Sequence, residues 1–196
     1  MRNKRMARRN LGIVALLIAG LLVFALVEGV VLPRVDQREE LYAQEQLSPL
    51  THDIARTGKF KTKYMGNASK VSGLFRSLPL GPIRSFALDP DTFTVQVNLE
   101  ASLPESDGSR DSAMLYGATA AFAYIGNLET VIFNDDQRAY KVTREELQQW
   151  YGFGALANLT EDSSVWNQEV QSKLANREYV RQAIERLFHE TAALAV

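Results

Sequence analysis

An uninterrupted apolar run near the start of the chain limits its folding more than any other feature. Leu11–Val27 contains no charged side chain, and the run reaches Leu32 if Glu28 is allowed near its end. A helix over residues 11–32 would be about 33 Å long, enough to cross a hydrocarbon core of about 30 Å. Such a helix has no polar face with which to lie at the surface of a globular domain. We therefore predict a transmembrane anchor at Leu11–Leu32, with the lipid bilayer as its partner.

The charges that flank this run predict its orientation. Residues 1–10 carry a basic cluster made of Arg2, Lys4, Arg5, Arg8 and Arg9, whereas the four residues directly after Leu32, Pro33 to Asp36, are nearly balanced in charge. Basic flanks stay in the cytoplasm. We expect a cytoplasmic segment at 1–10 and a single pass through the cell membrane, with the C-terminal domain extracytoplasmic. A cleavable signal peptide is the alternative, but its apolar region is normally about 7–15 residues long and ends in small residues.

Charge and composition limit the class of partner. The formal net charge is −1 for the whole chain, and residues 33–196 hold more acidic than basic side chains. Because a nucleic-acid-binding domain usually has a concentrated basic surface, we expect no nucleic-acid partner, and the same count argues against a lipid-binding surface. The chain has no Cys, which excludes disulfides, a cysteine nucleophile and a Cys-ligated metal.

The rest of the chain divides into a polar stalk at 33–49, which Pro49 ends, and one domain at 50–196. Local patterns predict helices at 67–78, 112–125 and 143–151, and one long last helix at Ser164–Leu194. They predict strands at 83–88, 93–99, 130–133 and 139–142. The predicted fold class is α+β: a small, mainly antiparallel sheet with helices on one face, preceded by one transmembrane helix.

The search for catalytic and metal-binding motifs is mostly negative. The two histidines, His52 and His189, lie far apart without carboxylates at ligand spacing, and each is expected to be a solvated helical residue. A zinc site needs three or four ligands, so we predict no metal and no cofactor. There is no G-x-S-x-G elbow, Ser-x-x-Lys pair or phosphate-binding glycine loop. The sequence therefore predicts no catalytic residue and a protein that is not an enzyme.

Two alternatives stay open. An envelope hydrolase could assemble its site only in three dimensions, from Ser69 or Ser72 with Lys70, or from the acid pair Asp89 and Asp91. An assembly factor could dock its C-terminal helix on a membrane protein.

Two further groups of residues each allow two interpretations. Trp150 and Tyr151 are core residues or an exposed rim that grips a peptide or glycan, and Lys59, Lys61 and Lys63 are a solvated edge or a contact with anionic lipid or wall polymer.

Four stretches together resemble a known family. They are Lys63–Val71, Ser77–Leu80, Ala118–Asn127, and Thr143–Leu147 running into Trp150-Tyr151. The runs Y-x-G-[DN]-x-S-K-V and T-R-E-x-L-x-x-W-Y, in this order, resemble an uncharacterised bacterial extracytoplasmic domain-of-unknown-function family over about residues 59–154. Asn67-Ala68 departs from its more usual acidic residue and Asn, which weakens a charge-based role at that turn.

The resemblance implies an anchored or sensor-associated module of a Gram-positive-type cell envelope, and carries no catalytic residue. Together with the topology it predicts a non-catalytic role in binding, sensing or regulation at the bacterial cell envelope, with a protein or envelope-polymer partner. The candidate binding residues are Tyr64, Asn67, Ser69, Lys70, Trp150 and Tyr151.

Overall fold

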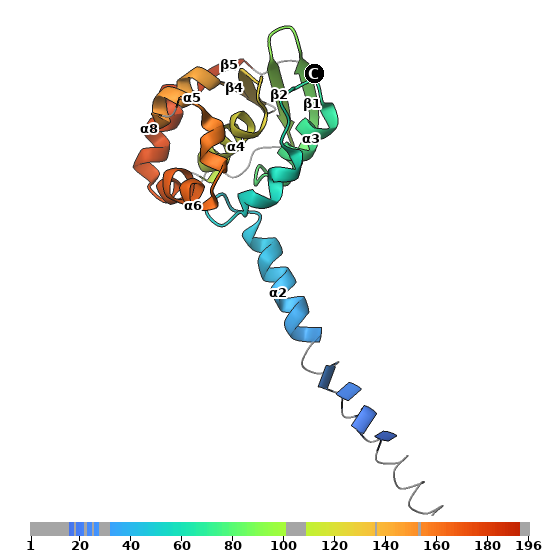
Figure 1. Ribbon diagram of the computed structural model, residues 1–196. Helices are drawn as coiled ribbons and strands as arrows, with labels where there is room; N and C mark the ends of the chain where they lie inside the picture. The colour runs from blue at the N-terminus through green and yellow to red at the C-terminus, as the bar shows by residue number, and fades with distance from the viewer. Residues whose placement is uncertain are drawn as a thin grey trace, which may run out of the picture. The chain divides into compact units, whose positions relative to one another are not determined.

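The computed structural model describes residues 16–17, 19–21, 23–24, 26–27, 32–100, 109–135, 137–152 and 154–192. The chain forms two compact units, Met1–Gln44 and Glu45–Val196. Helix α2 (Leu32–Glu45) shows that the polar stalk segment is helical, and it ends before Pro49 (Figure 1). Most of the predicted anchor lies outside the described residues. Among the residues that are described, no helix is both long and apolar enough to span a membrane.

The second unit is built on a five-stranded sheet with the strands in chain order. These are β1 (Ile83–Asp89), β2 (Thr94–Leu99), β3 (Thr130–Asn134), β4 (Arg138–Thr143) and β5 (His189–Ala192). Only the β2–β3 pair is parallel, because helix α4 (Ser109–Tyr124) connects these strands and a parallel pair requires such a crossover. The predicted α+β class and the mainly antiparallel sheet are confirmed.

The core lies between this sheet and the helices. Val95 and Val97 of β2 stand opposite Val131 and Phe133 of β3, and all four are at most 1% exposed. Helix α4 is central in the domain, and every residue from Ala113 to Tyr124 is buried (Figure 1). It contacts β3 on one side and helices η4 (Leu156–Thr160) and α8 (Arg177–Leu187) on others. The sheet therefore supports an inner helix that other helices cover.

Several helix boundaries lie where local sequence signals predict them. Helix α3 (Ala68–Ser77) begins after Asn67, whose Oδ1 accepts the Lys70 N–H at 3.2 Å. Helix α5 (Arg144–Tyr151) begins with a capping box in which Thr143 and Glu146 satisfy each other's backbone N–H groups. It ends at Gly152, whose φ of 70° places it in the left-handed region that favours glycine.

The prediction of one long last helix is wrong. Residues 163–192 form α6 (Ser163–Trp166), the π-helical turn η5 (Asn167–Gln171), α7 (Ser172–Leu174), α8 and strand β5. The break occurs at Asn176, because its Oδ1 accepts the N–H groups of Glu178 and Tyr179 and so starts a new helix. After α8 the chain leaves the helix to pair with β4.

The apolar arc of the predicted last helix packs inside this domain. The arc predicted from the sequence has seven members. Six of them are at most 6% exposed, namely Trp166, Val170, Leu174, Val180, Leu187 and Phe188, and the seventh, Ile184, is partly buried against the core. The assembly-factor hypothesis needs this arc as a docking surface for a partner, and in the structure the arc belongs to the core.

Candidate binding pocket

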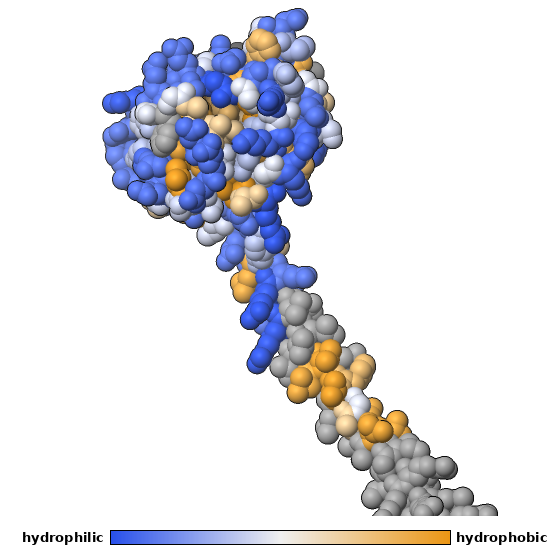
Figure 2. Space-filling model, in the orientation of Figure 1, coloured by the Kyte–Doolittle hydropathy of each residue, from blue (hydrophilic) through white to orange (hydrophobic). Residues whose placement is uncertain are grey.

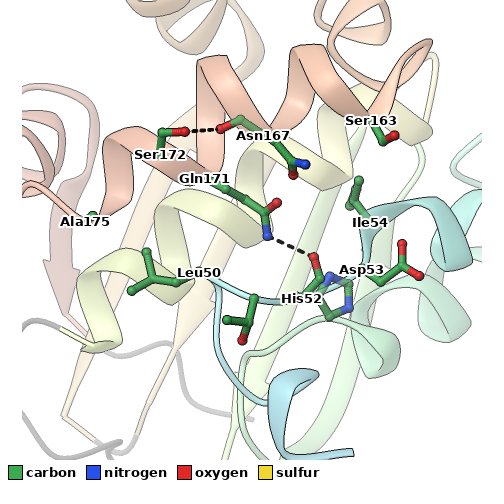
Figure 3. Close-up of a pocket in the computed structure, with 10 residues that line it drawn as sticks. Leu50, His52, Asp53, Ile54, Ser163, Asn167, Gln171, Ser172 and Ala175 are labelled. Carbon is green, nitrogen blue, oxygen red and sulfur yellow. Dashed lines mark hydrogen bonds between the residues drawn. The ribbon is translucent and has the colours of Figure 1, made fainter. Parts of the chain in front are cut away.

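A pocket of about 560 Å³ lies between two segments that are far apart in the sequence (Figure 3). One wall is the stretch that leads into helix η2 (Ile54–Phe60), and the other is the α6–η5–α7 region. The lining residues are Leu50, Thr51, His52, Asp53, Ile54, Ser163, Asn167, Gln171, Ser172 and Ala175. Hydroxyl and amide groups predominate among the polar side chains, and they share the surface with a few aliphatic ones.

The second wall contains the π-helical turn. The Ser172 backbone N–H donates to the Asn167 carbonyl, and the Ser172 hydroxyl donates to the same oxygen at 2.5 Å. Single π turns within helices are rare and frequently occur at functional sites. The turn leaves Asn167 exposed, and no described residue forms a hydrogen bond with its side-chain amide. This amide is therefore available to a ligand.

Gln171 connects the two walls. Its Nε2 donates to the carbonyl of Pro49 at 3.0 Å and to that of His52 at 2.9 Å. Figure 3 shows this nitrogen turned toward the His52 backbone. Because both amide hydrogens are used, the orientation of the Gln171 side chain is fixed and Oε1 remains an acceptor. The pocket is thus held in shape before any ligand binds.

His52 lies behind the pocket wall and is only 4% exposed, which corrects the expectation of a solvated helical residue. One ring nitrogen, Nε2, lies 2.8 Å from the Ser77 carbonyl, and the other, Nδ1, lies 2.8 Å from the Tyr116 hydroxyl. A carbonyl only accepts, so the neutral ring carries its proton on Nε2 and accepts from Tyr116 at Nδ1. Burial lowers the pKa of His52, so the ring is neutral at neutral pH.

This environment predicts a pH dependence of stability. The pKa of His52 is lower in the folded state than its usual value near 6.5, so the unfolded chain gains a proton first as the pH falls. The free energy of unfolding should therefore decrease below about pH 6.5, before the carboxylates titrate. Urea titrations between neutral and mildly acidic pH should show this slope, and His52→Gln should flatten it. An equal slope in this variant would contradict the assignment.

The first group of sequence-predicted site residues gathers at the start of α3, away from the pocket lining. Tyr64 is 69% exposed, Asn67 caps the helix and Ser69 is exposed. The Lys70 ammonium donates to the Lys59 carbonyl. The loop is held in place by the Met65 N–H, which donates to Asn127 Oδ1 at 2.6 Å. The structure thus brings these four residues together at one helix terminus.

Trp150 and Tyr151 lie on a different element, α5, and face the interior. Trp150 Nε1 donates to the Tyr179 hydroxyl of α8 at 2.7 Å. The Tyr151 hydroxyl is 3.2 Å from Thr119 Oγ1 of α4, and burial raises the pKa of Tyr151. Both side chains therefore connect helices. Of the two interpretations of this aromatic pair, their contacts match core packing.

The candidate hydrolase groups are engaged in local contacts. The Ser72 hydroxyl donates to the Ser69 carbonyl at 3.4 Å, and Lys70 bonds to Lys59 as described above. Asp89 accepts the Asp91 N–H at 3.0 Å and the Thr92 hydroxyl at 2.7 Å, which is the bonding of a turn aspartate.

The structure also locates His189 and the side chains that could bind a metal ion. His189 lies on strand β5, not on a helix as expected, and its Nε2 is 2.6 Å from Glu146 Oε1. Within the described part of the chain, no three His, Cys, Asp or Glu side chains are placed to share a metal ion.

The second wall of the pocket has a pattern in the sequence that differs from the apolar periodicity of the same segment. Ser163, Asn167, Gln171 and Ala175 recur at intervals of four, which makes a polar or small stripe along one side of a helical segment. The apolar arc of the same segment predicts a helix but does not indicate a pocket. His52 carries no comparable local signal, because its partners are 25 and 64 residues away.

Comparison with known proteins gives one match. Residues 58–144 match the model of a family described as a domain of unknown function (DUF4825). This confirms the resemblance to an uncharacterised domain family, although the match ends before Trp150-Tyr151. Searches of curated proteins and of solved structures found no match. The matched residues extend from η2 to the start of α5, so the Ser163–Ala175 wall of the pocket lies outside them.

Proposed function

We propose that this chain is a membrane-tethered, extracytoplasmic binding and sensing domain of the bacterial cell envelope, and that its pocket takes a neutral segment of an envelope polymer. The observation that carries the proposal is the pocket fixed by Gln171, which connects two distant segments through hydrogen bonds to Pro49 and His52. A pocket whose shape is set in advance loses less conformational entropy when a ligand binds.

The lining favours a neutral ligand that is rich in hydroxyl and amide groups. Thr51, Ser163 and Asn167 offer uncharged hydrogen-bonding groups, and Leu50 and Ile54 offer apolar surface. Asp53 is the one acidic side chain of the lining, and its carboxylate lies 3.7 Å from Arg56 Nε. The lining contains no Lys or Arg, so a polyanionic ligand is disfavoured. Sugar hydroxyls and peptide amides have the required mixture of donors and acceptors.

The state of His52 favours binding without chemical conversion of the ligand. A general acid or base needs a proton-accepting atom within reach of the reacting group. Both nitrogens of His52 are occupied by Ser77 and Tyr116. The side chain in the pocket wall that is best suited to proton transfer therefore has a structural role.

The tether rests on the apolar run Leu11–Leu32 and its basic flank. Among the described side chains of this run, Leu16 is 74% exposed, Leu17 63%, Leu21 67% and Phe24 59%. Figure 2 shows hydrophobic side chains on the surface of the described part of the first unit. Each Å² of apolar surface left in water costs about 25 cal/mol, so these side chains favour a lipid environment. The basic residues 2–9 would hold the N-terminus in the cytoplasm.

Calorimetric titration of the full-length chain in nanodiscs with soluble glycan-peptide fragments of the envelope tests the proposal. Asn167→Ala should weaken binding about tenfold, because it removes up to two hydrogen bonds. The matched control is Asn158→Ala, an exposed residue outside the pocket, which should bind like the unmodified chain. Equal affinity in the two variants would overturn the pocket assignment. Mass spectrometry should recover the fragments intact, and cleaved fragments would favour the hydrolase alternative.

A further inference from the structure

Residues 33–196 are negative overall, but they include a long segment whose charged residues are all basic. Residues 54–88 contain no Asp or Glu and seven basic residues, which are Arg56, Lys59, Lys61, Lys63, Lys70, Arg76 and Arg84. A net charge taken over a whole domain cannot reveal such a segment. The expectation that this domain lacks a lipid-binding surface rested on the net charge of residues 33–196. Whether the domain has such a surface depends instead on where these basic side chains lie.

The fold places this segment on three adjacent elements, η2, α3 and β1. The rings of Phe75 on α3 and Phe86 on β1 lie 6.0 Å apart, and the Arg76 guanidinium lies 5.3 Å from the Phe86 ring. The Lys70 ammonium donates to the Lys59 carbonyl and so connects α3 to η2. Figure 2 shows a largely hydrophilic edge over α3 and β1. The elements that carry the basic residues therefore lie next to one another in the domain.

The chain between η2 and α3 contributes two further exposed lysines. Thr62 pairs with Ile125 through backbone bonds to Tyr124 and Gly126, which makes this short stretch extended. Side chains alternate in extended chain, so Lys61 and Lys63 project on the opposite side from Thr62, and both are exposed. Tyr64, next to them, is 69% exposed.

Most of these charges have no acidic partner. Five residues form no salt bridge with any carboxylate in the described part of the chain, and we call them the basic face: Lys59, Lys61, Lys63, Lys70 and Arg76. Asp53 and Asp89 bound the segment in sequence, and Asp53 pairs with Arg56. The basic face therefore presents an uncompensated positive charge to solvent.

We propose that the basic face docks on the anionic headgroups of the membrane that holds the tether. Lys and Arg near such a surface are each attracted to it, and Tyr is enriched at the level of the headgroups, which suits Tyr64. The charges of the basic face lie on η2, on the chain that follows it and on α3, and they do not converge in a pocket. Such a spread suits an extended charged plane better than a single bound phosphate. This inference rests on the proposed tether, which raises the effective concentration of the face near the bilayer.

The absence of Cys allows a clean test with the full-length chain. Ser69→Cys, on α3, carries an environment-sensitive fluorophore, and Ser163→Cys, on α6, carries it in a control sample. Both samples are inserted in nanodiscs with and without phosphatidylglycerol. We expect a blue-shifted, quencher-protected label at position 69 only in anionic discs, and loss of this protection at high salt. No difference between the two lipid compositions would overturn the proposal.

Charge-reversed variants identify the residues responsible. Lys61→Glu with Lys63→Glu should lower the ratio of docked to undocked protein at least about 25-fold, since each lysine contributes about fivefold. The control, Lys141→Glu with Arg177→Glu, changes the net charge equally at exposed positions elsewhere and should dock normally. Equal losses in both variants would show a general charge effect and contradict the assigned face.

Two further readouts separate this proposal from its alternatives. Co-elution with the nanodisc reports the tether independently of the label. If the chain does not co-elute, the tether fails, and flotation of the same labelled chain with phosphatidylglycerol vesicles then tests the basic face by itself. If soluble polyphosphate binds the basic face while anionic discs leave the label unchanged, the partner is a polymer and the membrane proposal is wrong.

Discussion

Replacement of Asp135 by Ala is expected to lower the free energy of unfolding by about 3–5 kcal/mol, because it removes a buried carboxylate that balances the charge of a buried guanidinium. Arg110 at the start of α4 pairs with Asp135 in the β3–β4 turn, and their side chains are 8% and 6% exposed. The Arg110 guanidinium also lies 4.9 Å from the ring of Tyr140. Asp135 Oδ1 additionally accepts the N–H groups of Gln137 at 2.8 Å and Arg138 at 2.7 Å. One substitution thus removes the counter-charge and the turn bonds together.

Urea unfolding of the full-length chain measures this effect, and a double-mutant cycle isolates the ion pair. Arg110→Met combined with Asp135→Asn should lose less stability than the sum of the single variants, because the buried charge and its counter-charge are then removed together. The exposed pair Arg138–Glu190, at 3.5 Å, serves as a control, and Glu190→Ala should cost less than about 1 kcal/mol. A loss below about 1 kcal/mol in Asp135→Ala would contradict a buried ion pair.

Acid titration gives a second check on Asp135. Burial alone would raise its pKa, but the N–H groups of Gln137 and Arg138 and the charge of Arg110 hold the pKa below its usual range. A carboxyl whose pKa is lower in the folded state stabilises the fold above its unfolded pKa of about 3.9. That stabilisation is lost as the pH falls through the lower, folded pKa. Asp135→Asn should therefore reduce the acid-induced loss of stability in this range.

Features encoded by neighbouring residues were predictable from the sequence. Asn67 starts α3, and Thr143 with Glu146 starts α5, because a cap and its N–H partners lie within three residues of each other. The two antiparallel hairpins, β1–β2 and β3–β4, follow from alternating strands joined by turn residues. In each case the atoms that make the contact are close in the chain, so their spacing contains the information.

Features that depend on distant partners were not predictable. The cap at Asn176 is local, but the pairing of β5 with β4 that follows α8 joins residues about 50 positions apart, and no local pattern indicates it. Helix α4 has an apolar arc in sequence, yet the fold buries its other side as well. The pocket likewise depends on Gln171, which bonds to carbonyls 119 and 122 residues away.

The site residues illustrate the same limit. Tyr64, Asn67, Ser69 and Lys70 lie close together because they are near one another in sequence. Trp150 and Tyr151 are taken up by contacts with Tyr179 and Thr119, which no local pattern specifies. A motif that is visible in sequence can therefore mark a structural junction as readily as a binding surface, and only the partners of its side chains distinguish the two.

Arg144, the last residue of the family match, marks such a junction, and Arg144→Ala should lower the free energy of unfolding by about 3–4 kcal/mol. Its guanidinium donates to the carbonyls of Phe122 at 3.0 Å, Ile125 at 2.6 Å and Leu128 at 2.7 Å. These carbonyls follow the chain from the last turn of α4 into the loop before β3, where backbone oxygens lack helical partners. The positive charge also complements the negative end of the α4 dipole.

Comparison of Arg144→Ala with Arg144→Lys separates hydrogen-bond geometry from charge. Lysine keeps the charge, but its compact ammonium cannot reproduce the planar fork that reaches three carbonyls, so we expect an intermediate loss of about 1–2 kcal/mol. Urea unfolding gives these values. Hydrogen exchange should show the largest loss of protection at the Ile125 and Leu128 N–H groups, which bond within the α4 terminus. If Arg144→Lys were as stable as the unmodified chain, charge alone would suffice and the three-carbonyl cap would be unnecessary.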